Sequence, residues 1–467
     1  MPINSFLYPG VKVTPVFEVA NSLRFDDGSS DYLQISSSSG SNTTGTFSAW
    51  IKRGNLSSTQ CPIGVAVDGN NFINIQFNSS NQLNLRWYDD GSPDANYNTT
   101  AVFRDVSAWY HVVMAFDTTQ STSSDRVKVY VNNTLHTLSG YPPQNNTIMF
   151  NTGSATLQVG SSGFANSFLD GYMAEVCWID GTALDPTSFG ETDEDTGIWK
   201  PIDVSGLTFG TNGFYLDFEN SGSLGADVSG NGNNFTVNNL TSIDQTTDTC
   251  TNNFCTMSPL TSTQNFNLSE GNLKLGAAAD NKDLAGTIAG TIDNTNSGYY
   301  YEYKVNASNL GSSGEGFRVG ILNVNDIMIT STSARVLQMT QTDLIYETAT
   351  NGGASATDTN IGSASNGDIV MVAWKNGKVW FGVNGTFVNS GNPSAGTGEQ
   401  FSGLSGDYIP WIMCSLTNGV NGSQFNFGNP TFSISSGNAD ANGYGNFEYA
   451  PPTGFYALCT KNLAEYG

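Results

Sequence analysis

Three acidic residues in the segment ETDED, Glu191, Asp193 and Asp195, alternate along the chain. On a β-strand this spacing places side chains on one face. Two carboxylates about 5 to 9 Å apart are what glycoside hydrolysis requires. The segment, however, lies beside Gly190 and Gly197 and lacks a flanking apolar strand pattern. We therefore expect a solvated acidic loop here rather than a catalytic pair.

The other titratable residues also form no catalytic group. Glu175 and Asp180 fall on opposite faces of the expected strand, so they do not pair. His111 lies in an apolar strand, where a core role is expected, whereas His136 ends a hairpin and is expected to be exposed. No serine or cysteine stands on a strained turn beside a base. The sequence thus predicts a protein that is not an enzyme.

The segment WYDDGSPDANY has the composition of a sugar-binding loop. Sugar sites use an aromatic face for the apolar side of the ring, with amide, carboxylate and backbone groups for the hydroxyls. An alternative for Trp87 is that it closes the preceding strand. The candidate ligand-binding residues are Trp87, Tyr88, Asp89, Asp90, Asn96 and Tyr97.

Calcium is the one cofactor that the sequence suggests. Asp68, Asp89 and Asp90 are carboxylates in turn-like segments, and calcium prefers such oxygen ligands. The alternative is that these residues simply form turns.

Short strands must position all of these side chains. Apolar and polar residues alternate at period two between turn signals such as Asp27-Gly28 and Asn132-Asn133, and no helical pattern intervenes. This pattern is typical of antiparallel sandwiches. In the first half the predicted strands are 22–25, 32–35, 46–52, 63–67, 72–77, 83–88, 109–116, 126–131, 156–159 and 171–179. In the second half they are 299–305, 317–322, 369–374, 378–383, 408–413 and 424–427.

Composition limits the classes of partner. The chain has 17 Lys and Arg against 41 Asp and Glu, a net charge of -24, so nucleic acid and anionic membranes are poor partners. The sequence contains no run of about 18 apolar residues, so it does not predict insertion into a membrane. Six cysteines in 467 residues are too sparse for a disulfide framework, although Cys250 and Cys255 could close a small loop. Trp374 and Trp380 alternate with apolar residues and are expected in a core.

Both halves resemble known β-sandwich families. The first resembles the laminin G or concanavalin-type jelly roll, through FSAWIKRG, WYHVVMAFD, VKVYVNNTL and DGYMAEVCWIDGTALDP. The second resembles the SPRY family, also a concanavalin-like sandwich, through SGYYYEYKV, GFRVGI, NGDIVMVAWKNGKVWFGVNGTFVNSGNP, DYIPWIM and FNFGNPTF. Residues 278–295 depart from the SPRY pattern, so ligand specificity does not transfer. We therefore expect an all-β chain of two concanavalin-type antiparallel sandwiches, with an irregular linker and an extended N-terminal arm.

The predicted organisation has four parts. Residues 1–18 form an arm that is either an edge strand or an anchor, 19–191 the laminin G-like sandwich, 192–258 a linker with one added strand, and 259–467 the SPRY-like sandwich. The anchor is the favoured interpretation of the arm, because it is apolar and contains two prolines. Its candidate anchoring residues are Phe6, Leu7, Tyr8, Val11 and Val13.

Further stretches resemble structural proteins of marine and cyanobacterial tailed phages. They are LDFENSGSLGADVSGNGNNFTVNNL, TDTCTNNFCTMSPL and the tail YAPPTGFYALCTKNLAEYG. The resemblance implies a virion surface protein, a tail fibre, spike or capsid fibre, that binds host-surface glycan during attachment. Its arm would contact other virion proteins, and a homo-oligomer, with a trimer favoured, would multiply weak sugar contacts. The alternatives are a decoration protein without receptor binding and a glycan depolymerase.

Overall fold

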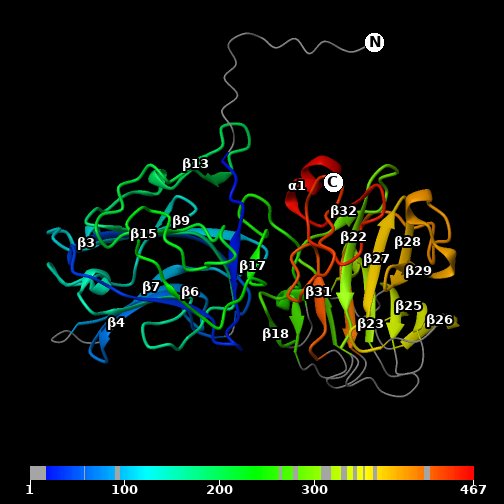
Figure 1. Cartoon of the computed structure of the whole chain (residues 1–467), viewed down its shortest axis with the longest axis horizontal. Helices are drawn as coiled ribbons and strands as arrows, with labels where there is room; N and C mark the ends of the chain where they lie inside the picture. Colours follow the sequence, from blue (N-terminus) through cyan, green and yellow to red (C-terminus); the bar gives the residue numbers. More distant parts are fainter. Residues whose placement is uncertain are drawn as a thin grey trace, which may run out of the picture.

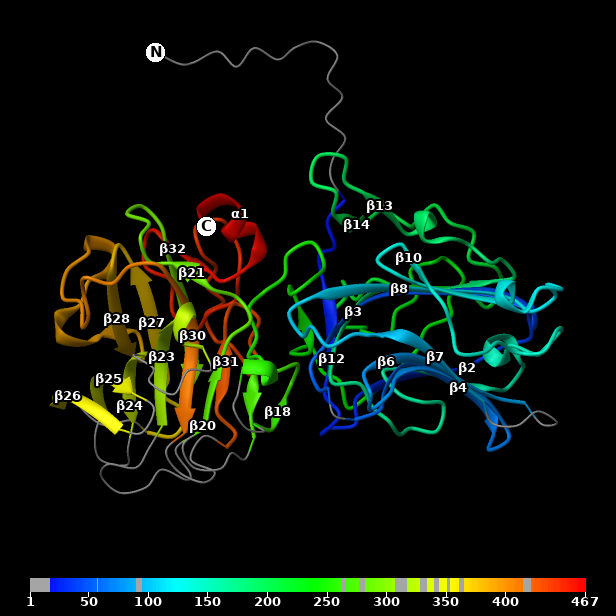
Figure 2. The same ribbon diagram turned by 180° about the vertical axis from the view of Figure 1, so that it is seen from behind.

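The protein consists of two antiparallel β-sandwiches of the concanavalin-like type, lying side by side (Figures 1 and 2). The computed structural model describes residues 17–56, 58–89, 95–261, 266–276, 282–306, 317–327, 334–339, 344–350, 353–360, 365–414 and 421–467. Within these ranges the chain has one α-helix, the C-terminal α1 (Thr460–Tyr466). No helix in the described ranges has the length and hydropathy needed to cross a membrane.

The first sandwich has two facing sheets. Sheet 1 has the strand order β10 (Thr134–His136), β9 (Val127–Val131), β8 (Trp109–Asp117), β3 (Thr44–Arg53), β12 (Gly171–Asp180), β1 (Ser22–Phe25) and β17 (Gln245–Thr246), and β15 (Phe214–Leu216) pairs with β12. Sheet 2 has the order β16 (Thr236–Asn238), β2 (Tyr32–Ser36), β11 (Thr156–Val159), β4 (Gln60–Asp68), β5 (Asn71–Phe77), β6 (Gln82–Tyr88) and β7 (Ala95–Val102).

The period-two alternation of these strands creates the core between the sheets. In β3, Phe47, Ala49 and Ile51 are buried in the main core. Trp50 is also buried, on the opposite face, because sheet 1 is covered on its outer side as well. There Phe189 and Phe209 pack over the sheet. The central strands of sheet 1, such as β3 and β12, are thus buried on both faces.

Residues 192–251 are an integral part of the first sandwich, which corrects the prediction of a linker, whereas Phe254, Cys255 and Met257 pack in the second sandwich. The one predicted added strand is present as β15, and β16 and β17 join the two sheets. Isolated apolar side chains such as Leu224, Phe235 and Leu240 enter the core. Because they are separated by turn residues, they leave no periodic pattern to detect. A hairpin of β13 (Gly190–Thr192) and β14 (Trp199–Pro201) precedes them.

The second sandwich repeats the two-sheet plan. One sheet has the order β18 (Leu268–Ser269), β19 (Lys274–Leu275), β31 (Gln424–Asn426), β22 (Gly298–Lys304), β27 (Ile369–Lys375), β28 (Lys378–Val383) and β29 (Thr386–Phe387), with β32 (Phe455–Ala457) parallel to β22. The other has β20 (Lys282–Ala285), β30 (Asp407–Cys414), β23 (Phe317–Asn323), β24 (Ala334–Met339), β25 (Leu344–Thr350) and β26 (Gly353–Asn360), with β21 (Gly290–Thr291) on β30. Single 3-10 turns are η1 (Ser123–Asp125), η2 (Met149–Asn151), η3 (Pro186–Ser188), η4 (Pro259–Thr261), η5 (Val324–Asp326), η6 (Val388–Ser390) and η7 (Pro393–Ala395).

Every predicted strand is present, with ends shifted by at most a few residues. Strands β7 and β24 to β26, and several shorter strands such as β16, β20 and β32, were not predicted. The anchoring residues Phe6, Leu7, Tyr8, Val11 and Val13 lie outside the described residues, so the predicted role of the arm stays a prediction.

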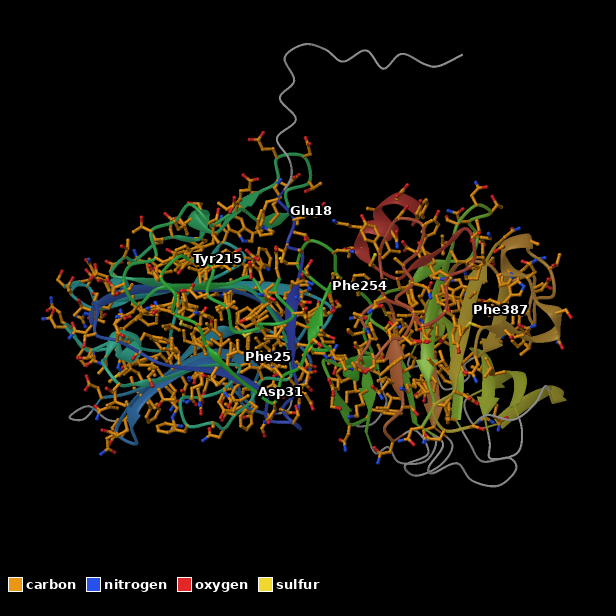
Figure 3. The ribbon with its side chains drawn as sticks, viewed as in Figure 1. Glu18, Phe25, Asp31, Tyr215, Phe254 and Phe387 are labelled. Atoms are coloured by element: carbon orange, nitrogen blue, oxygen red, sulfur yellow. The ribbon has the colours of Figure 1, made fainter. Side chains whose placement is uncertain are left out.

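Buried polar groups join the two sandwiches. The Lys52 ammonium donates to Asp248 Oδ2 (2.7 Å), Asn253 Oδ1 (2.7 Å) and the Phe254 carbonyl (2.9 Å). Phe254 itself lies at the junction (Figure 3). From β1, Arg24 pairs with Glu270 of the second sandwich at 3.2 Å. These contacts hold the sandwiches together.

Candidate functional site

A cleft of about 440 Å³ lies where the two sandwiches meet. The first sandwich contributes the region around β17, and the second contributes the segment that follows β31. No lining residue is titratable, although the chain as a whole carries a net charge of -24. The described lining residues are Asn21, Ser221, Ser242, Ile243, Gln245, Thr246, Thr247, Gly428, Asn429, Pro430, Phe432, Ser433, Ile434 and Asn446.

Amide and hydroxyl groups dominate this lining. Asn429 is 2% exposed, and its Nδ2 donates to Asp248 at 3.4 Å. Its Oδ1, by contrast, receives no hydrogen bond from any described group. Asn446 and Thr247 are exposed on opposite walls, and Ile243 adds an exposed apolar side chain at 36%. Uncharged donors and acceptors beside apolar surface are the groups that a neutral polyol binds.

The composition of the lining also makes the cleft unsuitable for glycoside hydrolysis. Glycoside hydrolysis needs two carboxylates flanking the bond, and none of the described residues lining the cleft has a carboxylate, imidazole, thiol or amine. The cleft can therefore hold a ligand through hydrogen bonds, but its described lining includes no acid or base that could activate a hydroxyl such as that of Ser242.

Strand pairing separates the predicted sugar-binding residues onto two faces. They are not in one loop, because Trp87 and Tyr88 end β6 whereas Asn96 and Tyr97 begin β7. Trp87 pairs with Ala95 across the two strands, and Tyr97 pairs with Leu85. These residues lie on the side of the sheet that faces the core. Trp87 is 2% exposed and packs against the core, so it closes its strand, which was the alternative role.

The outer face retains the remaining candidates. Tyr88 and Asn96 lie on it, with Arg86 opposite Asn96. Asn96 is exposed, and Tyr88 is half-buried with its ring 5.9 Å from that of Phe72. This is a second polar surface, and its role in ligand contact remains a prediction.

Two of the predicted calcium residues, Asp68 and Asp89, lie at one end of sheet 2. Asp68 ends β4, is exposed, and accepts hydrogen bonds from the Asn70 backbone (2.8 Å) and Asn71 Nδ2 (3.0 Å). Asp89 follows β6 and is half-buried, whereas Asp90 lies outside the described residues. These bonds are those of a turn, the alternative role for Asp68.

The carboxylates of the acidic segment form ion pairs and hydrogen bonds within its own hairpin. Lys200 approaches Glu191 at 3.4 Å and Asp193 at 2.9 Å across the β13–β14 hairpin. Asp193 also accepts from Thr196, and hydrogen bonding from Lys200 and Thr196 holds its pKa below the usual range. Asp195 is exposed in the connecting turn. The expectation of a solvated acidic loop is confirmed.

A β-bulge in β12 directs Glu175 to the outer side of sheet 1. There it accepts a hydrogen bond from the Tyr215 hydroxyl at 2.6 Å. Burial raises the pKa of Glu175 to about 8. Asp180, at the far end of the strand, instead accepts from the Ser41 backbone. The two carboxylates are therefore not a pair, as expected.

His111 is a fully satisfied core histidine, as expected. The Trp199 indole donates to its Nδ1 at 2.9 Å, and its Nε2 lies 2.9 Å from Ser48 Oγ. Since an indole N–H only donates, Nδ1 is unprotonated and Nε2–H donates to Ser48. A histidine that activates a serine needs the opposite arrangement. Burial also lowers the pKa of His111 to about 3.

Three further expectations concern His136, the two tryptophans of the second half and the cysteines. His136 is half-buried rather than exposed, because its ring packs 5.5 Å from that of Phe103. Trp374 and Trp380 are fully buried, which confirms their core role. All six cysteines are free, including Cys250 and Cys255.

Sequence reasoning missed both the junction cleft and a group of three carboxylates, Asp26, Asp27 and Asp170. The cleft residues range from Asn21 to Asn446, so no local motif marks them. The group of carboxylates had one partial signal, the Asp-Asp pair after β1, which we interpreted only as a turn.

Comparison with known proteins supports the fold. Residues 27–187 match the family model of the Concanavalin A-like lectin/glucanases superfamily. No curated protein sequence matches the chain.

Several solved structures are similar to this chain at low sequence identity. A heptameric pentraxin of Limulus polyphemus is 16% identical, and the match covers 36% of this chain and 80% of that one with a TM-score of 0.29. Mouse laminin alpha1 domains LG4-5 are 9% identical, with coverage of 91% and 92% and a TM-score of 0.31. The SPRY domain of human HERC1 is 16% identical, with coverage of 36% and 96% and a TM-score of 0.25.

Proposed function

We propose that the protein is a non-enzymatic carbohydrate-binding protein that holds an uncharged glycan in the cleft between its two sandwiches. One observation carries this proposal: the described residues that line the cleft are all uncharged, mostly with amide or hydroxyl groups, on a chain with a net charge of -24. A charged ligand would find no counter-charge there, whereas sugar hydroxyls would find donors and acceptors.

Binding at a single cleft is expected to be weak. Each neutral hydrogen bond contributes about 0.5–1.5 kcal/mol net, and the cleft is open to water on one side. Several copies on one particle would raise the effective affinity, because the second contact becomes intramolecular. A homo-oligomer, with a trimer favoured, is therefore part of the proposal.

The proposed setting is the surface of a tailed-phage virion, as a tail fibre, spike or capsid fibre used in attachment to host glycan. The support is the sequence resemblance of residues 216–240 and of the C-terminal tail to phage structural proteins. In this setting, residues 1–18 would contact other virion proteins. A decoration protein without receptor binding is the alternative.

A glycan array of neutral and sialylated oligosaccharides, probed with the purified full chain, tests the binding proposal. We expect binding to neutral glycans, weakened about 3- to 10-fold by Asn446→Ala through loss of one hydrogen-bonding side chain. The matched control is Asn96→Ala, which removes an exposed asparagine from the outer face of sheet 2.

The control distinguishes the two polar surfaces. Weaker binding by the Asn96 variant with unchanged binding by the Asn446 variant would move the site to sheet 2. Failure of the wild-type chain to bind either the array or host cells would favour the decoration protein. New reducing ends on host polysaccharide would instead support a depolymerase.

A further inference from the structure

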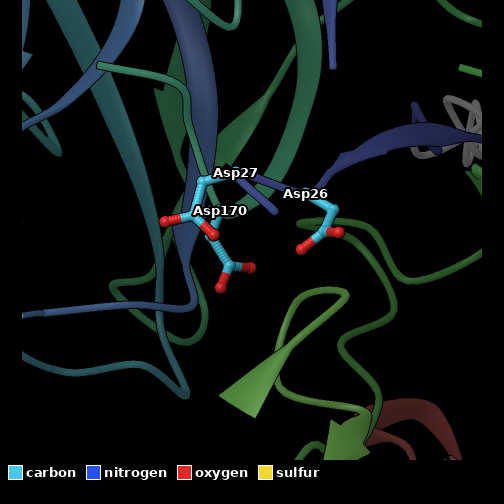
Figure 4. Close-up of side chains that lie close together, drawn as sticks. All are labelled: Asp26, Asp27 and Asp170. Carbon is cyan, nitrogen blue, oxygen red and sulfur yellow. The ribbon is translucent and has the colours of Figure 1, made fainter. Parts of the chain in front are cut away.

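Asp26, Asp27 and Asp170 bring three carboxylates together at the edge of the first sandwich (Figure 4). One oxygen atom from each lies within 4.8 Å of the others. The register of sheet 1 causes this, because Phe25 at the end of β1 pairs with Gly171 at the start of β12. The residues beside that pair, Asp26 and Asp170, must therefore be neighbours.

No cation in the described part of the chain neutralises these three carboxylates. The adjacent Arg24 forms its ion pairs with Asp244 and Glu270, each at 3.2 Å. Asp170 is fully buried, so its carboxylate has no contact with water. Like charges this close disfavour one another's ionisation.

One of the carboxylates has a buried oxygen atom without a partner. Asp170 Oδ1 accepts from the Gly271 backbone at 2.9 Å. Its Oδ2 is buried and receives no hydrogen bond from any described group. The nearby Asn272 Oδ1 is in the same condition, while its Nδ2 donates to the Gly54 carbonyl at 3.2 Å. Buried oxygen atoms without donors are expected to find another partner.

We propose that Asp26, Asp27 and Asp170 bind a calcium ion. The ligand set is all oxygen, which selects a hard cation. Calcium takes its ligands at about 2.3–2.6 Å, so two oxygens bound to one ion can lie up to about 5 Å apart, and the observed spread fits this range. Magnesium, which needs shorter bonds and strict octahedral geometry, fits less well.

The ion would also stabilise the junction between the sandwiches. The loop that carries Glu270 and Gly271 belongs to the second sandwich, and its backbone amides donate to Asp26 (3.3 Å) and Asp170 (2.9 Å). Without calcium, the three carboxylates repel one another beneath this loop. With calcium bound, most of their negative charge is compensated, and their oxygen atoms remain available as acceptors. Calcium binding and domain docking are therefore coupled.

Calorimetric titration of the chelator-treated full chain with calcium chloride tests the site, together with thermal unfolding. At calcium concentrations about 100 times the Kd, we expect the Tm to rise by about 5–10 °C. Asp170→Asn should abolish this rise and should leave the chelator-treated chain at least as stable as the wild type, because a repulsive charge is removed. Asp27→Asn, at a half-buried position, is a second variant if the first does not fold.

Asp68→Asn is the matched control, because Asp68 belongs to the calcium site suggested by the sequence. It should keep the full calcium response. An unchanged response in the Asp27 and Asp170 variants, a response lost only in the Asp68 variant, or no response of the wild type to millimolar calcium would overturn the proposal. Limited proteolysis adds a structural readout: calcium should protect the wild-type junction from cleavage and should not protect that of Asp170→Asn.

Discussion

Replacing Lys52 by methionine tests the buried polar junction between the sandwiches. The change keeps the aliphatic stem and removes the ammonium that contacts Asp248, Asn253 and Phe254. Lys52 is 1% exposed and Asp248 is fully buried, so the remaining carboxylate cannot be hydrated. Breaking such a pair by removing one partner costs about 3–5 kcal/mol.

The remaining partners of Asp248 set the expected value within this range. Its Oδ1 still accepts from Trp109 Nε1 (3.3 Å) and the Phe254 backbone (3.2 Å). These bonds stabilise the charge in part, and the expected loss in the free energy of unfolding is therefore nearer to about 3 kcal/mol at pH 8.

Urea unfolding followed by tryptophan fluorescence, at pH 8 and pH 5, measures this loss. Burial already raises the pKa of Asp248 against the lowering effect of Lys52. Without Lys52 the folded-state pKa rises further, so the folded chain gains a proton as the pH falls and the loss becomes smaller at pH 5. Lys52→Met with Asp248→Asn should be more stable at pH 8 than Lys52→Met alone. A loss below about 1 kcal/mol, or equal losses at both pH values, would refute this reasoning.

Three other variants probe the first sandwich and its docking. The folded-state pKa of Glu175, about 8, exceeds the ordinary pKa of 4.5 for a glutamate, so its contribution to stability is present below pH 4.5 and is lost as the pH rises through 8. From pH 5 to 8 the wild type should lose about 3–4 kcal/mol more than Glu175→Gln in urea unfolding, and parallel curves would contradict this assignment. Trp87→Ala should cost about 3–5 kcal/mol through a core cavity, without changing glycan affinity; weaker glycan binding by the folded variant would return Trp87 to the ligand site. Gly271→Ala should loosen the junction, because Gly271 has a φ of +60° and a Cβ there would lie 2.4 Å from the Tyr172 ring. Unchanged resistance to proteolysis in this variant would contradict the close docking.

Local patterns predicted most of the framework. Alternation identified β1, β5 and β12 because the row of side chains that each strand directs at the facing sheet is apolar, and this row is visible in the sequence. Strand β7 escaped because its sequence, ANYNTTAV, is largely polar. An edge strand with one solvated face carries little apolar signal.

The candidate sites were less predictable because they depend on long-range contacts. The cleft joins Thr246 to Asn429 across the two sandwiches. The carboxylate group joins Asp26 to Asp170 through the pairing of β1 with β12. Loop composition, by contrast, suggested Trp87 as a ligand contact, but strand alternation turns its ring into the core. Residue type alone could not show which way that side chain points.

A crystal structure of the full chain soaked with a neutral oligosaccharide that binds on the array would test the central claim most directly. Electron density for the sugar is expected between Gln245 and Asn446, in contact with side chains from both sandwiches. Density on the outer face of sheet 2, beside Tyr88 and Asn96, would contradict the assignment of the binding site to the junction cleft.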